Sequence, residues 1–304
     1  MTHYQLVAQN KRRSFLIIAL FMVFIVGAAY IMAKGLNYSL DIVAWALILS
    51  GGTTFLSYFY SDKVILGISG AKEAKRSEFF DFYTVTENIC LSQKIPMPKL
   101  YVIEDSAMNA FATGRNPEHA VVCATTGLLS RLKRSEIEAV IAHELSHVKN
   151  YDILLMSIVS VLVGLIALLA DWFSRMSFWG GGRRNDDDSN DQAGAILTII
   201  AVLLTILSPI VAQLIQLAIS RRREFLADAS GVEMTKNPEG LIKALSKISM
   251  DQEPLEAANK ATAHLYISNP LKNSRGSVRT FAKLFNTHPP IEERIAALKA
   301  MNKN

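Results

Sequence analysis

The segment His143-Glu144-Leu145-Ser146-His147 places two imidazoles and a carboxylate at a spacing that suits metal-dependent hydrolysis. Positions i and i+4 of a helix lie one turn apart on the same face, so His143 and His147 can bind one zinc ion. Glu144 would lie beside the metal, ready to accept a proton. A catalytic tetrahedral zinc ion has three protein ligands and a fourth position that is open to water, so one protein ligand is still missing. The metal lowers the pKa of the bound water from about 15.7 to about 7. The third ligand must come from elsewhere in the chain.

A second pair of residues with helical spacing can complete this site. Glu224 and Asp228 are four residues apart and therefore share one helical face. We assign Glu224 to the metal and Asp228 to a hydrogen bond with a ligand histidine, which fixes the tautomer of the imidazole and raises its basicity. The alternative for such a pair is a solvated helix face near arginines.

The zinc motif lies within a pattern typical of an amphipathic helix. Ser135 and Glu138 have the spacing of a capping box. Apolar residues follow at helical intervals, namely Ile137, Val140, Ile141, Leu145 and Val148. We therefore expect the two histidines to flank a buried stripe, which disfavours a chance match to the motif.

The composition indicates an integral membrane protein. Half of the residues are hydrophobic and 19% are charged. The apolar residues gather in four segments, 15–33, 40–60, 153–170 and 195–219, each near the roughly 20 residues that a membrane-crossing helix needs. We predict about four transmembrane helices, although the later pair could form a re-entrant or shallow hairpin. The first segment is long for a signal peptide and lacks a convincing cleavage site.

Basic residues predict the orientation of these segments, because positive loops face the cytoplasm. Lysines and arginines gather before the first and third segments and after the second and fourth, at residues 11–13, 63–76, 131–149 and 221–223. Both termini and the zinc helix should therefore be cytoplasmic, and the loop 171–194 external. Cys90 and Cys123 fall in the cytoplasmic portion, so we expect reduced thiols and no disulfide.

This topology explains how the two ligand-bearing segments meet. The third segment leaves the cytoplasm a few residues after His147, and the fourth returns a few residues before Glu224. A hairpin of these two segments would bring the two ligand helices side by side. At 1.5 Å per residue, the zinc ion would lie roughly 10 Å above the membrane boundary.

The region between the second and third segments predicts a helix and a small sheet. Residues 69–93 favour a helix, and 100–103, 109–113 and 120–123 favour short strands. Asn109-Ala110-Phe111 is the candidate sheet edge for pairing with an extended substrate backbone. The alternative is an ordinary packed strand.

The fold class that follows is mostly α with a small β-sheet, in a polytopic membrane protein. Its expected divisions are an N-terminal transmembrane pair (1–60), a first part of the protease domain (61–152), a second transmembrane hairpin (153–219) and a second part of the protease domain (220–304).

The order of these features resembles the HtpX-type membrane metalloproteases. The likeness covers nearly the whole chain and includes His143-Glu144-x-x-His147, Glu224-x-x-x-Asp228 and 285–290. It implies a thermolysin-like zinc fold, distantly related to the CAAX prenyl endopeptidases. It further implies one zinc ion per chain, with His143, His147 and Glu224 as ligands, Glu144 as catalytic base and Asp228 in support. Such enzymes belong to the bacterial or archaeal plasma membrane and act in quality control of misfolded or damaged membrane proteins.

Three further histidines and the charged segments carry weaker signals of function. His288 lies before two prolines that fix the backbone ahead of a helix, so it is the candidate second donor to the developing oxyanion, with a packing or capping role as the alternative. We expect His119 and His264 to be surface or structural residues. Asp186-Asp187-Asp188 fits a solvated external loop. The net charge of +5 is explained by the positive-inside rule, so no nucleic-acid partner is expected.

Two rival functions follow from the same residues. One is a membrane scaffold with a structural zinc ion, although such sites are usually closed by four ligands and often contain cysteine. The other is processing of prenylated proteins, which four spans rather than a larger intramembrane chamber make less favoured. The expected partners are the lipid bilayer and unfolded or membrane-protein substrates; the sequence does not fix the oligomeric state.

Overall fold

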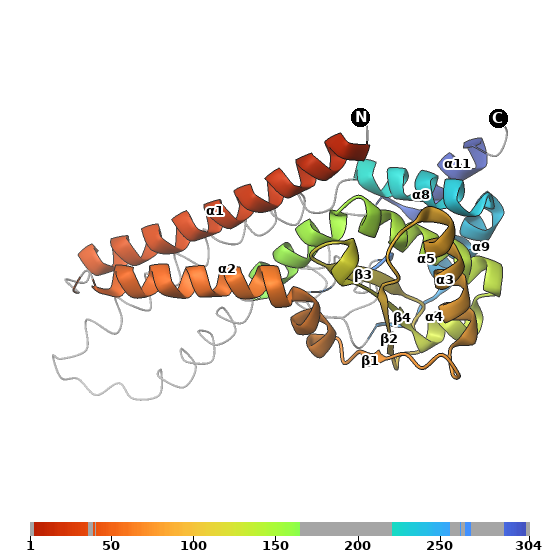
Figure 1. The fold of residues 1–304 in the computed structure, drawn as a ribbon, viewed down its shortest axis with the longest axis horizontal. Coiled ribbons are helices and arrows are strands. Elements are labelled where there is room, and N and C mark those ends of the chain that lie inside the picture. The colour runs from red at the N-terminus through yellow and green to blue at the C-terminus, as the bar shows by residue number, and fades with distance from the viewer. Residues whose placement is uncertain are drawn as a thin grey trace.

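Two long helices project from a mixed helical and stranded body (Figure 1). The structure is a computed structural model that describes residues 3–35, 39, 41–164, 221–255, 262, 265–268 and 289–301. The projecting helices are α1 (His3–Gly35) and α2 (Asp41–Ile68), which lie side by side. Many of their apolar side chains are exposed, among them Phe15, Val23, Trp45, Ile48 and Leu49. Such an apolar surface requires a lipid or protein covering.

The predicted membrane spans are only partly open to inspection. Among the described residues, one helix, Val43–Ile68, is long and apolar enough to cross a membrane. Arg134–Lys149 and Asp152–Gly164 pass the same test together, but they are bent by 85°. Segment 15–33 lies within α1, 153–170 is described only to residue 164, and 171–194 and 195–219 lie outside the described residues. The number of four spans therefore stays a prediction.

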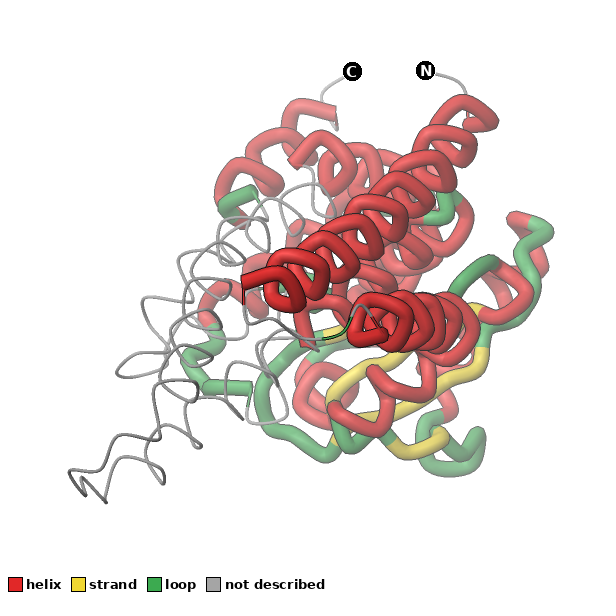
Figure 2. The backbone as a smooth tube through the Cα atoms, turned by 90° about the vertical axis from the view of Figure 1, so that its left-hand side faces the viewer, coloured by secondary structure: helices red, strands yellow, loops and turns green. Residues whose placement is uncertain are grey.

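A four-stranded mixed sheet lies below α8 and α11 in Figure 1, and Figure 2 shows its strands in yellow on one side of the body. Its strands are β1 (Lys72–Glu73), β2 (Lys99–Ile103), β3 (Ala110–Gly114) and β4 (Ala120–Thr125), in the order β1-β2-β4-β3. The central β2–β4 pair is parallel and the two outer pairs are antiparallel. The prediction of a mostly helical fold with a small sheet is confirmed.

One predicted helix is shorter than expected. The sequence favours a helix over 69–93, whereas α3 spans Phe80–Gln93. The preceding residues form a turn and then β1, because Gly70 has a φ of 62° and Ala74 N donates to Leu100 O of β2. Sheet pairing therefore outweighs local helical preference in this segment.

The helix that carries the zinc motif is α5 (Arg134–Lys149), which follows the short α4 (Thr126–Arg131). Its predicted apolar stripe is confirmed, since Ile137, Val140, Ile141, Leu145 and Val148 are all buried. The predicted capping box is wrong in detail. The helix begins before Ser135, and Glu136 Oε2 accepts the Lys133 backbone N–H at 2.7 Å.

Three later helices pack around α5. These are α8 (Arg221–Thr235), α9 (Pro238–Met250) and α11 (Ile291–Met301). Helix α5 contacts α8 and α9 directly, and it also contacts α3 and β3. The main core joins α3, the sheet, α5 and α9 around residues such as Phe82, Val122, Leu145 and Leu245. Most residues of α5 are thus buried against elements from other parts of the chain.

Candidate metal centre

Helix α5 presents His143 and His147 one turn apart on the same face, with Glu144 beside them. All three side chains are buried. The two imidazole rings stand nearly perpendicular, with centroids 4.9 Å apart. The spacing of the motif therefore places both imidazoles on one face of the helix, as expected.

Helix α8 brings Glu224 to these histidines. Its carboxylate oxygens lie 3.7 Å from His143 Nε2 and 3.6 Å from His147 Nε2. One potential ligand atom from each of the three residues lies within 4.8 Å of the others. This buried cluster of two imidazoles and a carboxylate is compatible with a metal site.

A glycine allows the two helices to approach this closely. A Cβ atom on Gly231 of α8 would lie 3.1 Å from the His143 backbone nitrogen and 3.3 Å from its Cα. These contacts are tighter than a side chain normally makes with a backbone, so a glycine suits this crossing of α8 and α5. The close approach carries Glu224, two turns earlier on α8, toward the histidines.

Each histidine contacts a carboxylate through its other ring nitrogen. His143 Nδ1 lies 2.9 Å from Asp228 Oδ1, and His147 Nδ1 lies 3.0 Å from Asp152 Oδ2. These contacts leave Nε2 of both rings facing Glu224. Carboxylate–histidine pairs of this kind fix the tautomer that binds a metal, so the residues fit a bound ion.

Asp152 belongs to a second buried network that reaches α1. Its Oδ1 accepts a hydrogen bond from Asn10 Nδ2 at 2.7 Å, and Asn10 Nδ2 also donates to Asn150 O at 2.9 Å. Arg223 Nη1 donates to Asn10 Oδ1 at 3.2 Å and lies 3.4 Å from Asp152 Oδ1. The amino-terminal helix thereby participates in holding His147.

Arg294 of α11 is a fully buried cation beside the centre. Its Nε and Nη2 donate to the two Asp228 oxygens at 2.8 and 2.6 Å, a bidentate pair, and Nη1 lies 3.6 Å from Glu224 Oε2. Burial alone would raise the pKa of Asp228, but the charge and hydrogen bonds of Arg294, together with His143, hold it below its usual value. Asp228 therefore remains ionised where it contacts His143.

Burial and charge also shift the other titratable groups. Burial raises the pKa of Glu144 above its ordinary value, outweighing the lowering by nearby imidazole and guanidinium charges. For His147, burial lowers the pKa, but the Asp152 hydrogen bond and the carboxylates of Glu224, Asp152 and Glu144 raise it to about 9. The surroundings thus favour proton uptake at both groups.

The edge of β3 is occupied in part by the chain itself. Ala110 O accepts the backbone N–H of Ile267 at 3.0 Å, and Asn109 Nδ2 donates to Ser268 O at 3.0 Å. Arg294 Nη1 donates to Ile267 O at 3.2 Å. A peptide that pairs with Asn109 and Ala110 must displace residues 267–268. Phe111 faces the core instead, with its ring 5.0 Å from that of Tyr266.

The other histidines and the cysteines have simpler positions. His119 is exposed, as expected, and its Nδ1 lies 2.7 Å from Asn116 Oδ1. His264 and His288 lie outside the described residues. Cys90 and Cys123 are buried free thiols, and burial raises the pKa of both. They form no disulfide, in agreement with the sequence-based expectation.

Sequence reasoning missed Asp152, Arg294, Asn10 and Arg223. The one available signal for Asp152 was its position beside the third apolar segment, only five residues after His147. Nothing in the pattern marked the other three, because each comes from an element whose placement is a tertiary result.

Comparison with known proteins agrees with this geometry. Residues 79–302 match Peptidase family M48. The chain is 42% identical to "Protease HtpX homolog" of Caldanaerobacter subterraneus over 300 residues, covering 99% of this chain and 98% of that protein. It is 44% identical over 303 residues to the protein of the same name from Streptococcus uberis, with 98% and 99% covered.

A solved structure shares the fold. The crystal structure of S. mikatae Ste24p aligns with a TM-score of 0.50 at 20% identity, covering 93% of this chain and 65% of that one. The HtpX relatives indicate a membrane protein, and the buried cluster suits a metallopeptidase. On the family match and these identities together, the chain belongs to peptidase family M48.

Proposed function

We propose that this chain is a membrane-bound zinc endopeptidase that cleaves unfolded or damaged membrane proteins at the cytoplasmic surface. The proposal rests on the buried cluster of His143, His147 and Glu224, in which Nδ1 of each histidine contacts a second carboxylate. The close M48 relatives, which are named proteases, support the reaction class.

Zinc is the metal proposed for this ligand set, because two histidines at HExxH spacing and a glutamate are the ligands of zinc peptidases. Two imidazoles and one carboxylate, with no described fourth side chain among the clustered ligands, match catalytic rather than structural zinc sites. When bound, zinc supplies Lewis acidity that polarises a peptide carbonyl and lowers the pKa of water. A closed structural site would require another protein ligand, so a scaffold function is less favoured.

Glu144 is the proposed general base. It accepts a proton from the attacking water and returns it to the leaving amine, and its burial-raised pKa suits both steps better than that of an exposed glutamate. Asp228 and Asp152 hold the imidazoles in place, while Arg294 keeps Asp228 ionised. His288 remains the proposed second donor to the oxyanion.

The proposed substrate is an extended backbone that displaces residues 267–268 and pairs with the β3 edge at Asn109 and Ala110. Main-chain recognition of this kind suits segments of little shared sequence, as expected for misfolded proteins. Phe111 would support this edge from the core rather than contact the substrate. The quality-control role and the cytoplasmic location rest on the HtpX resemblance and on the distribution of basic residues.

The experiment is a cleavage assay with the purified full chain in lipid nanodiscs. An unfolded polypeptide, a membrane-protein substrate and a farnesylated peptide are each incubated with zinc-loaded and with chelator-treated protein. The proposal expects zinc-dependent internal cleavage of the first two. Cleavage of the farnesylated peptide alone would replace it with prenyl-protein processing, and absence of cleavage with zinc fully bound would favour the scaffold.

A further inference from the structure

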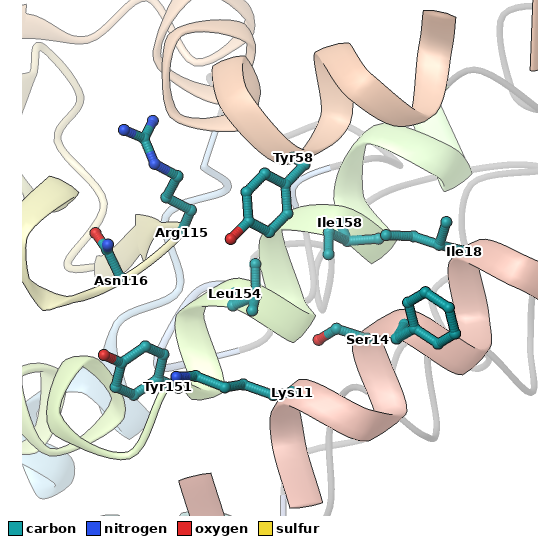
Figure 3. A pocket seen from close by; sticks show the side chains of 10 residues that line it. Lys11, Ser14, Ile18, Tyr58, Arg115, Asn116, Tyr151, Leu154 and Ile158 are labelled. Atoms are coloured by element: carbon teal, nitrogen blue, oxygen red, sulfur yellow. The ribbon is translucent and has the colours of Figure 1, made fainter. Parts of the chain in front are cut away.

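A cavity of about 390 Å³ lies between α1, α2, the turn after β3 and the helix that begins at Asp152 (Figure 3). None of the residues of the metal centre lines it. The cavity sits where the apolar run of α1 begins, directly after Lys11, Arg12 and Arg13. Its lining residues change in chemical character from one end to the other.

One end of the cavity is polar and cationic. Lys11 Nζ lies 4.4 Å from the centroid of the Tyr151 ring, and Figure 3 shows the two side chains reaching toward each other. Arg115 also lines the cavity, with its guanidinium against Phe59 of α2, where Nη1 donates to Phe59 O at 3.3 Å and leaves four further N–H donors. No carboxylate is among the described residues that line this cavity. The polar end is therefore suited to an anion.

The other end is apolar. Ile18 lies on the same face of α1 as Lys11, seven residues or about 10 Å further along the helix. Leu154 and Ile158 follow Tyr151 on the facing helix, and both are buried. Polarity thus falls in the same direction along both walls (Figure 3). Phe15, which also lines the cavity, is 73% exposed on the surface of α1.

The backbone at Tyr151 supports this arrangement. Tyr151 has a φ of 59°, a conformation that L side chains rarely adopt. It stands at the 85° bend between α5 and the next helix, and the bend directs the ring toward Lys11. The flanking residues Asn10 and Asp152 hydrogen-bond at 2.7 Å and reach His147, so the cavity shares its two walls with the support of the metal centre.

We propose that this cavity binds an anionic phospholipid, with the phosphate beside Lys11, at a cavity that Arg115 also lines, and an acyl chain along Ile18, Leu154 and Ile158. The cationic end complements a phosphate and the apolar end complements an acyl chain. The two ends are aligned with the direction in which α1 becomes apolar. A soluble anion would fill only the polar end. Arg12 and Arg13 attract anionic lipids to the same place.

Native mass spectrometry of the full chain tests the proposal. Protein is released from nanodiscs of equimolar phosphatidylglycerol and phosphatidylcholine, and the retained lipids are counted. We expect one retained phosphatidylglycerol per chain. Lys11→Gln should weaken its retention about fivefold and the Lys11→Gln, Arg115→Gln double variant about thirtyfold, while the charge-conserving Lys11→Arg retains it.

Lys63→Gln is the matched control. Lys63 also lies over a tyrosine, 5.1 Å from the Tyr60 centroid, but outside the cavity. Because Lys11 is exposed, its single variant keeps the fold, which circular dichroism verifies. The proposal would be overturned if the chain retained phosphatidylcholine as well as phosphatidylglycerol. It would also be overturned if Lys11→Gln and the double variant both retained phosphatidylglycerol as well as the wild type does. Full displacement of the lipid by inorganic phosphate would assign the cavity to a soluble anion instead.

Discussion

At the residue scale, the centre consists of two imidazoles whose outer nitrogens each meet a carboxylate. The sequence revealed one of these carboxylates, because Asp228 shares a helical face with Glu224. It did not reveal the other. Asp152 reaches His147 because Tyr151, with a φ of 59°, bends the chain between them. A tyrosine rarely adopts this backbone conformation, so the bend is not readable from the sequence.

Removing the second carboxylate should weaken metal binding. In Asp152→Asn, the charge that orients and polarises His147 is lost, so we expect zinc affinity to fall by roughly 10- to 100-fold. Competition with a chromophoric chelator measures this. Asp251→Asn is the control, since Asp251 is a buried carboxylate that bonds Met108 N and Arg131 away from the centre. An equal loss in both variants would mean a general effect on folding.

Zinc affinity should also depend steeply on pH. Before a metal binds, His147 has a pKa of about 9, where the raising by Asp152 and Glu224 overcomes the lowering by burial. Zinc must displace that proton, so below pH about 9 its affinity should fall about tenfold per pH unit, and it should level off above. Isothermal titration in buffers of different ionisation heat counts the protons released. A pH-independent affinity between about pH 7 and 9 would refute this assignment.

At the element scale, the sequence predicted α5 and its buried stripe correctly because the 3.6-residue period is strong over this segment. It failed at 69–79, where pairing of β1 with β2 decides the conformation. Two packing contacts were equally hidden. Residues 267–268 occupy the edge of β3 at Ala110. Arg294 contacts Asp228 from a helix 66 residues later in the chain. Such long-range contacts leave no local pattern.

The approach of α8 to α5 should be sensitive to a single methyl group. In Gly231→Ala the new Cβ meets the His143 backbone at 3.1 Å, so α8 must shift and carry Glu224 away from the histidines. We expect at least a tenfold loss of zinc affinity with the fold retained. Gly67→Ala in α2 is the matched control, because nothing lies within 4 Å of its Cβ. Unchanged zinc affinity in Gly231→Ala would show that the interface adapts without moving Glu224.

At the scale of the whole molecule, the two halves of the metal centre flank the segment 165–220 in sequence and meet in space through α5 and α8. The sequence predicted this meeting from a transmembrane hairpin between them, and the contact of α5 with α8 agrees with it. The participation of α1 was not predicted. Its Asn10 connects the amino-terminal helix to Asp152, so this helix, which the sequence predicts to cross the membrane, also supports the site.

The predicted topology can be measured in intact cells. After replacement of the buried Cys90 and Cys123, one cysteine is introduced within 183–191 and, separately, one in the carboxyl-terminal residues. An impermeant maleimide should label the first and not the second, because the distribution of basic residues predicts that both termini are cytoplasmic. Labelling of the carboxyl end with protection of the loop would reverse the orientation.

The central claim is that Glu144 performs proton transfer beside a bound metal. Its most direct test compares Glu144→Gln with the wild type in the same nanodiscs, measuring bound zinc and cleavage of an unfolded polypeptide together. Glu138→Gln on the same helix is the control. We expect Glu144→Gln to bind one zinc ion per chain yet lose cleavage by at least about 100-fold, while the control keeps both. Cleavage by Glu144→Gln at the wild-type rate would contradict the account.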